Sequence, residues 1–155
     1  WSSLPLYAVL LFLAYKNLGP RKTVILLLTV VVMITMTDQL ANFFKFGVHR
    51  LRPCHDSEVS PYMRLVKDYC GGQFGYFSAH AANSMAVAFF FTYILREKYR
   101  YIGIFLVLWA VLVGYSRIYI GVHFPLDVVT GMFFGLVFGW IFVQLFTFVN
   151  HKYQI

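Results

Sequence analysis

Charged residues are scarce in this chain of 155 residues, where Asp, Glu, Lys and Arg together make up 12%. Only two cysteines are present, and no repeat, low-complexity tract or interdomain linker divides the chain. Hydrophobic residues account for 60% and aromatic residues for 20%, with a mean hydropathy of +0.69. A soluble domain of this length could not bury so much apolar surface in one core. The composition therefore excludes a soluble class and predicts one membrane-embedded domain over residues 1–155.

The chain also lacks the marks of a signal peptide, because its first apolar stretch has no charged segment before it and no small-residue cleavage site. It begins with Trp1 inside that stretch, so we expect the natural protein to be longer at its N-terminus. The net charge is +7, but the basic residues lie in short clusters between apolar runs. Membrane topology and an anionic ligand explain such clusters better than nucleic acid, which we do not expect as a partner.

Five apolar segments are visible, at residues 4–15, 23–44, 77–95, 101–115 and 124–149. A helix that spans a membrane needs about 20 apolar residues, a length that the second, third and fifth segments reach. The first is short, and the fourth is long enough only if residues 116–121 continue its helix. Because these runs lack the alternation of barrel strands, we expect an all-α integral membrane bundle. We expect five visible transmembrane segments, with a sixth, N-terminal one missing.

The connections between the segments indicate which side of the membrane each faces. With five crossings, residues 16–22, residues 96–100 and Lys152 share one side, which holds seven basic residues and one acidic residue. Because cytoplasmic loops are rich in Lys and Arg, we assign this side to the cytoplasm. The long loop 45–76 then lies on the periplasmic, outer face of a bacterial inner membrane. That face holds six basic residues, three of which we expect to bind a ligand.

Three polar clusters lie at the outer ends of these segments. The first is the stretch KFGVHRLRP at residues 45–53, where the second segment ends. The second is Ser78-Ala79-His80, where the third segment begins. The third bridges the fourth and fifth segments and comprises Ser116, Arg117, His123 and Asp127. Since all three reach the same membrane face, we expect them to form one pocket.

In order and spacing, these clusters resemble the three-part signature of the type 2 phosphatidic acid phosphatase family, whose fold is shared with vanadium-dependent haloperoxidases. The matching positions are Lys45, Arg52, Pro53, Ser78, His80, Ser116, Arg117, His123 and Asp127. This sequence departs from the family at Phe77 and Ala79, where the family usually has Pro and Gly. Ala79 still offers a backbone N–H group, so we expect weakened loop geometry rather than lost activity.

The basic residues of the pocket suit a phosphate group. Arg52 and Arg117 can clamp phosphate oxygens in pairs, while Lys45 supplies a point charge. Such cations near lipid are costly without an anionic partner, although Lys and Arg at helix ends also snorkel to headgroups. Ser78 and Ala79 open a helix, whose free N–H groups and positive dipole end favour an anion. We expect these five residues to bind substrate phosphate, with Ser78 also able to act as an N-cap.

His123 and Asp127 lie four residues apart, which places them on one face of a helix that begins near His123. A carboxylate that orients an imidazole leaves the other ring nitrogen free to attack and stabilises the charge that forms. We therefore expect His123 to be the nucleophile and Asp127 its orienting partner, as the resemblance also implies. A phosphohistidine would form and then be hydrolysed. His80 would protonate the leaving group and then activate water.

Other polar residues have supporting roles in this interpretation. Ser116 supports the neighbouring arginine loop or forms a local hydrogen bond. Asp38 lies within the second apolar segment, so we expect it to pair with a cation at the pocket rim. Asn83 can hydrogen-bond across helices. His49 and Arg50 fit a solvated loop better than a substrate contact.

The two cysteines, Cys54 and Cys70, share the outer loop, and on an oxidising side they could form a disulfide. It would close a loop of about 15 residues, which is typically worth ~3 kcal/mol. The alternative is a metal site with His49, His55 or Asp56, for which no known ligand spacing fits well. We expect no metal and no other cofactor.

The leading interpretation is a phosphatase that acts on a phosphate monoester or diphosphate of a membrane lipid. Phosphatidic acid, phosphatidylglycerophosphate, a polyprenyl diphosphate and a phosphorylated lipid A stay open as substrates, as does the oligomeric state. An anion or phospholipid transporter is the first alternative, but His123, Asp127 and His80 would then have no role. A haloperoxidase-like enzyme that holds vanadate in the same pocket is the second, and it fits a lipid-facing site poorly.

Overall fold

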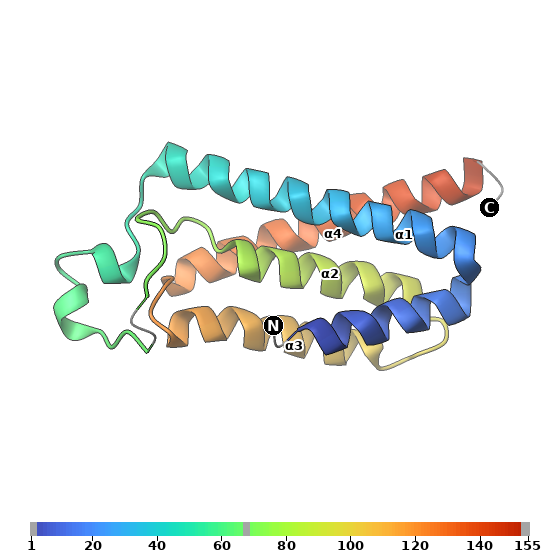
Figure 1. Ribbon diagram of the computed structural model, residues 1–155, viewed down its shortest axis with the longest axis horizontal. Helices are drawn as coiled ribbons and strands as arrows, with labels where there is room; N and C mark the ends of the chain where they lie inside the picture. The colour runs from blue at the N-terminus through green and yellow to red at the C-terminus, as the bar shows by residue number, and fades with distance from the viewer. Residues whose placement is uncertain (1–2, 67–68, 153–155) are drawn as a thin grey trace.

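The computed structural model describes residues 3–66 and 69–152, which form an elongated helical bundle (Figure 1). Its helices are α1 (Leu4–Val48), α2 (Ala79–Leu95), α3 (Ile102–Tyr119) and α4 (Pro125–Lys152), with the short 3₁₀ helices η1 (Pro53–His55) and η2 (Ser60–Tyr62) between α1 and α2. Within these residues no strand occurs, apart from an isolated bridge between Leu51 and Phe74. The predicted all-α class is therefore confirmed.

Helix α1 is 45 residues long but consists of two arms that meet at a break. Gly19 has φ +78° and ψ 173°, a non-helical conformation that is strained for any residue with a side chain. Pro20 follows and opens the second arm, where its missing N–H group costs nothing. The hydroxyl of Thr23 donates a 2.7 Å hydrogen bond to the carbonyl oxygen of Gly19. In Figure 1 the chain turns back at this break, and the second arm runs along the bundle to its left-hand end.

The prediction of five transmembrane segments is not matched. Its first two segments both lie in α1, on either side of the break. Among the described residues, three helices, α1, α3 and α4, are long and apolar enough to cross a membrane, whereas α2 is apolar but only 17 residues long, less than the roughly 20 of a typical span. Helix α3 has 18 residues because it continues past Tyr115 to Tyr119. Large apolar side chains such as Leu108, which is 58% exposed, cover the outside of these helices, as expected of an integral membrane protein.

Helices α2 and α4 pack against each other through their backbones. Three glycines recur every four residues along α4, at Gly131, Gly135 and Gly139. A Cβ atom at any of them would lie 3.0 Å or less from a backbone oxygen, that of Ser78, Ala82 or Ala86. Small residues at this interval allow membrane helices to approach closely. Because both helices begin at the same end of the bundle, this contact fixes their N-termini side by side.

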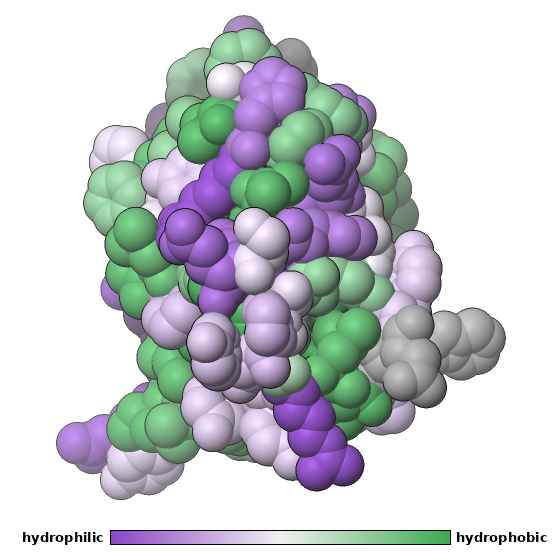
Figure 2. Space-filling view, turned by 90° about the vertical axis from the view of Figure 1, so that its left-hand side faces the viewer, coloured by the Kyte–Doolittle hydropathy of each residue, from purple (hydrophilic) through white to green (hydrophobic). Residues whose placement is uncertain are grey.

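The described parts of the long connection, residues 49–66 and 69–78, lie at one end of the bundle, together with the ends of α1 and α3 and the starts of α2 and α4 (Figure 1). Figure 2 looks onto this end, where hydrophilic side chains gather near the middle with hydrophobic ones around them. The connection begins later than the predicted loop 45–76, because α1 extends to Val48. Lys45 therefore stands in the last turn of α1.

Candidate active site

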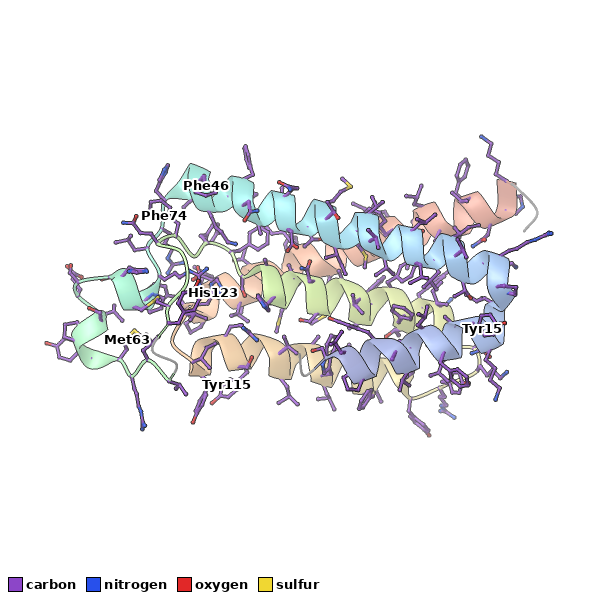
Figure 3. All side chains as sticks on the ribbon, in the orientation of Figure 1. Tyr15, Phe46, Met63, Phe74, Tyr115 and His123 are labelled. Carbon is purple, nitrogen blue, oxygen red and sulfur yellow. A yellow bond between two sulfur atoms is a disulfide. The ribbon has the colours of Figure 1, made fainter. Side chains whose placement is uncertain are left out.

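The three polar clusters of the sequence converge on one cavity of about 1070 Å³ at this end of the bundle. Figure 3 places His123 there, where the long connection approaches the start of α4. Nine of the predicted catalytic, binding and supporting residues line the cavity: Asp38, Lys45, Arg52, Ala79, His80, Asn83, Ser116, Arg117 and His123. Two others, Ser78 and Asp127, are fully buried and do not line it.

Three basic side chains enter the cavity from three different elements. Lys45 comes from the last turn of α1, Arg117 from the last turn of α3, and Arg52 from the connection. In the described part of the chain, no carboxylate lies within 4.0 Å of any of them. The Nε atom of Arg117 is buried and has no hydrogen-bond partner among these residues. Cations that surround a cavity without a protein counter-ion are suited to hold an anion.

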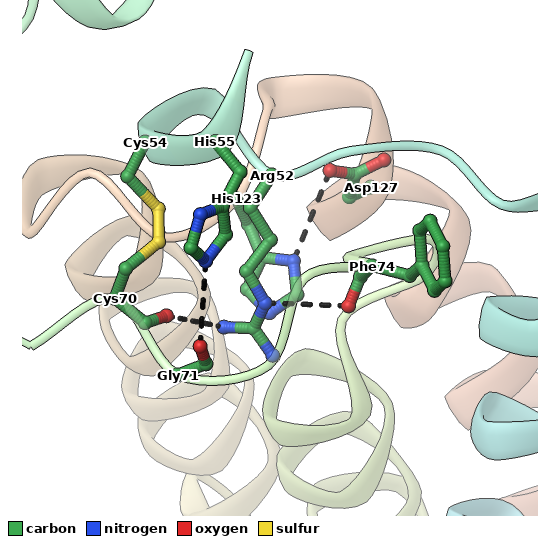
Figure 4. The surroundings of a disulfide bond; sticks show 8 residues. All are labelled: Arg52, Cys54, His55, Cys70, Gly71, Phe74, His123 and Asp127. Carbon is green, nitrogen blue, oxygen red and sulfur yellow. Dashed lines mark hydrogen bonds and ion pairs between the residues drawn. A yellow bond between two sulfur atoms is a disulfide. The ribbon is translucent and has the colours of Figure 1, made fainter.

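Backbone carbonyl groups of the connection hold Arg52 in place (Figure 4). Its Nη1 atom donates a 3.0 Å hydrogen bond to the carbonyl oxygen of Cys70, and its Nε atom donates one of 3.3 Å to that of Phe74. Gly75 cannot carry a side chain here, because a Cβ atom would lie 2.8 Å from Cγ of Arg52. A side chain that is fixed before the ligand arrives loses less entropy on binding.

Cys54 and Cys70 are joined in a disulfide next to this arginine (Figure 4). Because Cys70 also supplies a carbonyl oxygen to the guanidinium group, the disulfide restrains the backbone that holds the cation. The two cysteines and His55 are the one group of three potential metal ligands found in residues 3–66 and 69–152. His49 and Asp56, the other residues of the alternative metal site, are not part of it, and both sulfur atoms are used in the disulfide.

His123 and Asp127 come together where α4 begins. The helix starts at Pro125, so His123 precedes it and Asp127 is its third residue. The Nδ1 atom of His123 lies 3.8 Å from Oδ2 of Asp127, a separation that catalytic pairs often show before substrate binds. The backbone N–H group of Phe124 donates a 2.9 Å hydrogen bond to the same Oδ2 atom. Nδ1 therefore faces the carboxylate, and Nε2 is left for a ligand.

The surroundings of His123 favour its neutral form. The residue is 5% exposed, and Nδ1 has no hydrogen-bond partner among the described residues. Burial lowers the pKa of His123 below its ordinary value of 6.5, and the positive charges of Arg52 and Lys45 act in the same direction. Asp127 opposes these effects. A neutral imidazole carries the lone pair that a nucleophile needs.

The start of α2 brings Ala79 and His80 to the cavity but not Ser78. Ser78 is the N-cap residue, yet its hydroxyl makes no capping bond and has no partner in the described part of the chain. Its backbone N–H group donates a 2.9 Å hydrogen bond to the carbonyl oxygen of Asp127. Gly131 of α4 lies against the backbone of Ser78, where a Cβ atom would come 2.5 Å from the carbonyl oxygen. The lining of the cavity therefore does not support the predicted contact between the Ser78 hydroxyl and substrate phosphate.

Asp38 has a different partner from the predicted rim cation. The Nδ2 atom of Asn83 donates a 2.8 Å hydrogen bond to Oδ1 of Asp38, which links α2 to α1. Among the described residues, no basic side chain has a nitrogen atom within 4.0 Å of the Asp38 carboxylate. Lys45 stands about two helical turns closer to the end of α1. The hydroxyl of Ser116 donates a 2.6 Å hydrogen bond to the carbonyl oxygen of Val113, so it bonds locally within α3.

Sequence reasoning missed Arg50, which it placed in a solvated loop. The Nη1 atom of this residue lies 3.0 Å from Oδ1 of Asp127. The one signal in the sequence was indirect: a carboxylate buried in a membrane protein needs a cation, and the first cluster holds two arginines, Arg50 and Arg52.

Comparison with known proteins identifies relatives of this chain. It is 37% identical over 150 residues to a lipid A 4'-phosphatase of Bacteroides thetaiotaomicron, a match that covers 96% of this chain and 64% of that protein. It is 35% identical over 150 residues to a lipid A 4'-phosphatase of Porphyromonas gingivalis, where the match covers 94% and 61%. The chain thus spans less than two thirds of the length of these two relatives.

The fold has a counterpart among solved structures. The crystal structure of a transmembrane PAP2 type phosphatidylglycerolphosphate phosphatase from Bacillus subtilis superposes with a TM-score of 0.65 at 24% sequence identity. The superposition covers 96% of this chain and 69% of that one. Residues 22–150 match the PAP2 superfamily. This range includes the three cations that line the cavity and the two histidines His80 and His123. The chain therefore belongs to the PAP2 superfamily.

Proposed function

We propose that this protein is a membrane lipid phosphatase that removes phosphate from a lipid at the outer face of a membrane. The observation that carries the proposal is the convergence of three unpaired cations and two histidines on one cavity, with the buried carboxylate of Asp127 next to His123. The cations match the charge of a phosphate group. The histidines supply what simple binding does not need, a nucleophile and a proton donor.

In the first step, Nε2 of His123 attacks the phosphorus atom, and the bond between phosphorus and the lipid oxygen breaks. The leaving oxygen takes a proton from His80. Lys45, Arg52 and Arg117 offset the negative charge that spreads over the phosphoryl oxygens in the transition state. Asp127 stabilises the positive charge that forms on the imidazole.

In the second step, water attacks the phosphohistidine. His80, now neutral, accepts a proton from the water as its oxygen bonds to phosphorus. The bond between phosphorus and Nε2 breaks, its electron pair returns to the ring, and inorganic phosphate leaves. Both histidines are then in their starting states.

Among the possible substrates we propose a phosphate monoester of the lipid A class. Two relatives with 37% and 35% identity carry the name lipid A 4'-phosphatase, which supports this choice. Phosphatidic acid, phosphatidylglycerophosphate and polyprenyl diphosphate are the comparison substrates for the test.

The test is phosphate release from this panel by the protein in detergent. We expect release from the lipid A substrate, and loss of release in His123→Ala, because this variant lacks the proposed acceptor of the phosphoryl group. The matched control is His151→Ala, which alters an exposed histidine in the last turn of α4 at the other end of the bundle. Binding of a lipid without release would instead indicate an anion carrier, and full activity of His123→Ala would exclude the nucleophile.

Two reagents extend this test. Phosphate release should persist in EDTA, because side-chain cations provide the charge that a metal ion provides in other phosphatases. Vanadate should inhibit, because it adopts the five-coordinate geometry of the transition state. Complete loss of activity in EDTA would contradict the proposed cation set, and bromide oxidation with bound vanadate would favour the haloperoxidase alternative.

A further inference from the structure

Arg50 forms an ion pair with Asp127, the carboxylate of the catalytic pair, and does not point into the lining of the cavity. It lies between the end of α1 and η1, and its Nη1 atom lies 3.0 Å from Oδ1 of Asp127, a residue 77 positions further along the chain. It does not line the cavity, whereas Arg52, only two residues later, does. Two neighbouring arginines of the same loop thus face different partners.

Asp127 has need of this partner. Its side chain is fully buried, and an unpaired buried carboxylate is costly or becomes protonated. Its two oxygen atoms are used differently: Oδ1 accepts from Arg50, and Oδ2 accepts from the backbone of Phe124 and faces Nδ1 of His123. The arginine therefore determines which oxygen is left for the histidine.

Arg50 is itself held from two sides. Its guanidinium group lies 4.6 Å above the ring of Phe124, a favourable cation–π distance. Its carbonyl oxygen accepts a 2.9 Å hydrogen bond from the backbone N–H group of Gly75. Arg50, Phe124, Asp127 and His123 thus form one contiguous unit, which we call the clamp.

We propose that Arg50 is a positioning residue of the catalytic pair, which provides the buried carboxylate of Asp127 with a counter-ion and holds its Oδ2 atom towards His123. The proposal rests on the proposed function and adds a residue to it. Arg50 touches neither the phosphate nor the leaving group, because it lies outside the cavity wall. Its removal should lower kcat and leave phosphate affinity nearly unchanged.

The first experiment compares kcat, KM and the vanadate inhibition constant of Arg50→Gln, Arg50→Lys, Arg52→Gln and Arg64→Gln. Arg50→Gln should lower kcat at least tenfold and change KM and vanadate inhibition less than threefold. Arg50→Lys should recover part of kcat, since it keeps the charge. Arg52→Gln should weaken vanadate inhibition, and Arg64→Gln, an exposed arginine of the same connection, should match the wild type.

The second experiment is a double-mutant cycle with Asp127→Asn. If Arg50 acts through Asp127, then Arg50→Gln should reduce kcat much less in the Asp127→Asn background than in the wild type. The double variant removes both charges, so it also serves if Arg50→Gln alone leaves a buried unpaired carboxylate and does not fold.

The outcomes separate the two proposals. A wild type that releases no phosphate from any lipid overturns the proposed function, and with it the role of Arg50. An active wild type with unchanged kcat in Arg50→Gln overturns the positioning role alone. The positioning role is also overturned if Arg50→Gln lowers kcat by the same factor in the Asp127→Asn background as in the wild type. A change in KM and in vanadate affinity instead of kcat overturns it too, because Arg50 would then be a phosphate ligand.

Discussion

The helices that begin beside the two histidines, α2 and α4, and the helices that carry two of the cations, α1 and α3, pack in different ways. Helix α2, with His80, buries ten of its 17 residues and touches α4 backbone to backbone. Helix α3, with Arg117, buries three of its 18 residues, Leu106, Ala110 and Gly114, in a single stripe. Many other apolar side chains of α3, such as Ile104 and Leu108, are exposed on the outside of the bundle.

This difference in packing suits two different tasks, which are to position the histidines at α2 and α4 and to supply positive charge from α1 and α3. In the proposed mechanism, bond formation at phosphorus requires a nucleophile held within a fraction of an ångström, which the closely packed α2–α4 pair can provide. Charge stabilisation decays slowly with distance, so the less tightly packed α1 and α3 can carry Lys45 and Arg117 without equal precision. Substitutions in the two parts should therefore fail in different ways.

The largest effect is expected from Gly135→Leu in the α2–α4 contact. A side chain there collides with the carbonyl oxygen of Ala82, which cannot move without shifting the backbone of α2. We expect a loss of stability of about 3 kcal/mol or more, seen as a lower melting temperature in detergent, together with loss of activity. The control is Gly47→Ala, where a Cβ atom meets nothing within 4 Å. A Gly135→Leu protein that melts like the control would show that the pair is not rigid.

The next effect is expected from Arg117→Gln on α3. A charge-assisted hydrogen bond is worth about 1.5–3 kcal/mol, so kcat/KM should fall roughly ten- to hundredfold. The melting temperature should hardly change, in contrast to Gly135→Leu. Arg100→Gln provides the control, because this exposed arginine lies between α2 and α3 at the opposite end of the bundle. Equal activity of the two variants would show that Arg117 does not bind the substrate phosphate.

A smaller effect is expected when the disulfide is lost in the double variant Cys54→Ser/Cys70→Ser. The bond spans 16 positions, and a loop of this size contributes about 3 kcal/mol to stability when it is closed. The connection that holds Arg52 should loosen, which raises KM several-fold and changes kcat less, because the α2–α4 contact persists. A reducing agent should reproduce this change in the wild type and have no effect on the double variant. An unchanged KM in the double variant and in the reduced wild type would show that the disulfide does not contribute to phosphate binding.

The sequence predicted the features of this fold that depend on local pattern. The alternation of apolar segments brought the three clusters to one face, and the cavity lined by Lys45, His80 and Arg117 agrees with that. Helix continuity was harder to judge. The break at Gly19 separates two arms that the structure assigns to α1, and the apolar stretch of α2 yields a helix of only 17 residues.

Several side-chain partners could not be predicted, because they depend on contacts between distant parts of the chain, although a hydrogen bond of Asn83 across helices was expected. Arg50 and Asp127 are 77 residues apart, and no periodicity links them. Ser78 is fully buried and does not line the cavity, so its contact with phosphate stays a prediction. Asp38 accepts a hydrogen bond from Asn83 because the packing of α1 against α2 places the two residues next to each other, which hydropathy alone does not indicate.

The smallest effect is expected from the charges around His123, and it appears in the pH dependence of kcat/KM. The nucleophile must be neutral, so activity falls as the pH drops through the pKa of His123. Because burial lowers this pKa, with help from Arg52 and Lys45 and against Asp127, the acidic limb should lie below pH 6.5. Arg52→Gln removes one positive charge, which raises the pKa and moves the limb to higher pH, whereas Arg64→Gln leaves it in place. An acidic limb that stays fixed in Arg52→Gln would mean that the cations act on the phosphate alone, and that the neutral state of His123 results from burial in the rigid part of the bundle.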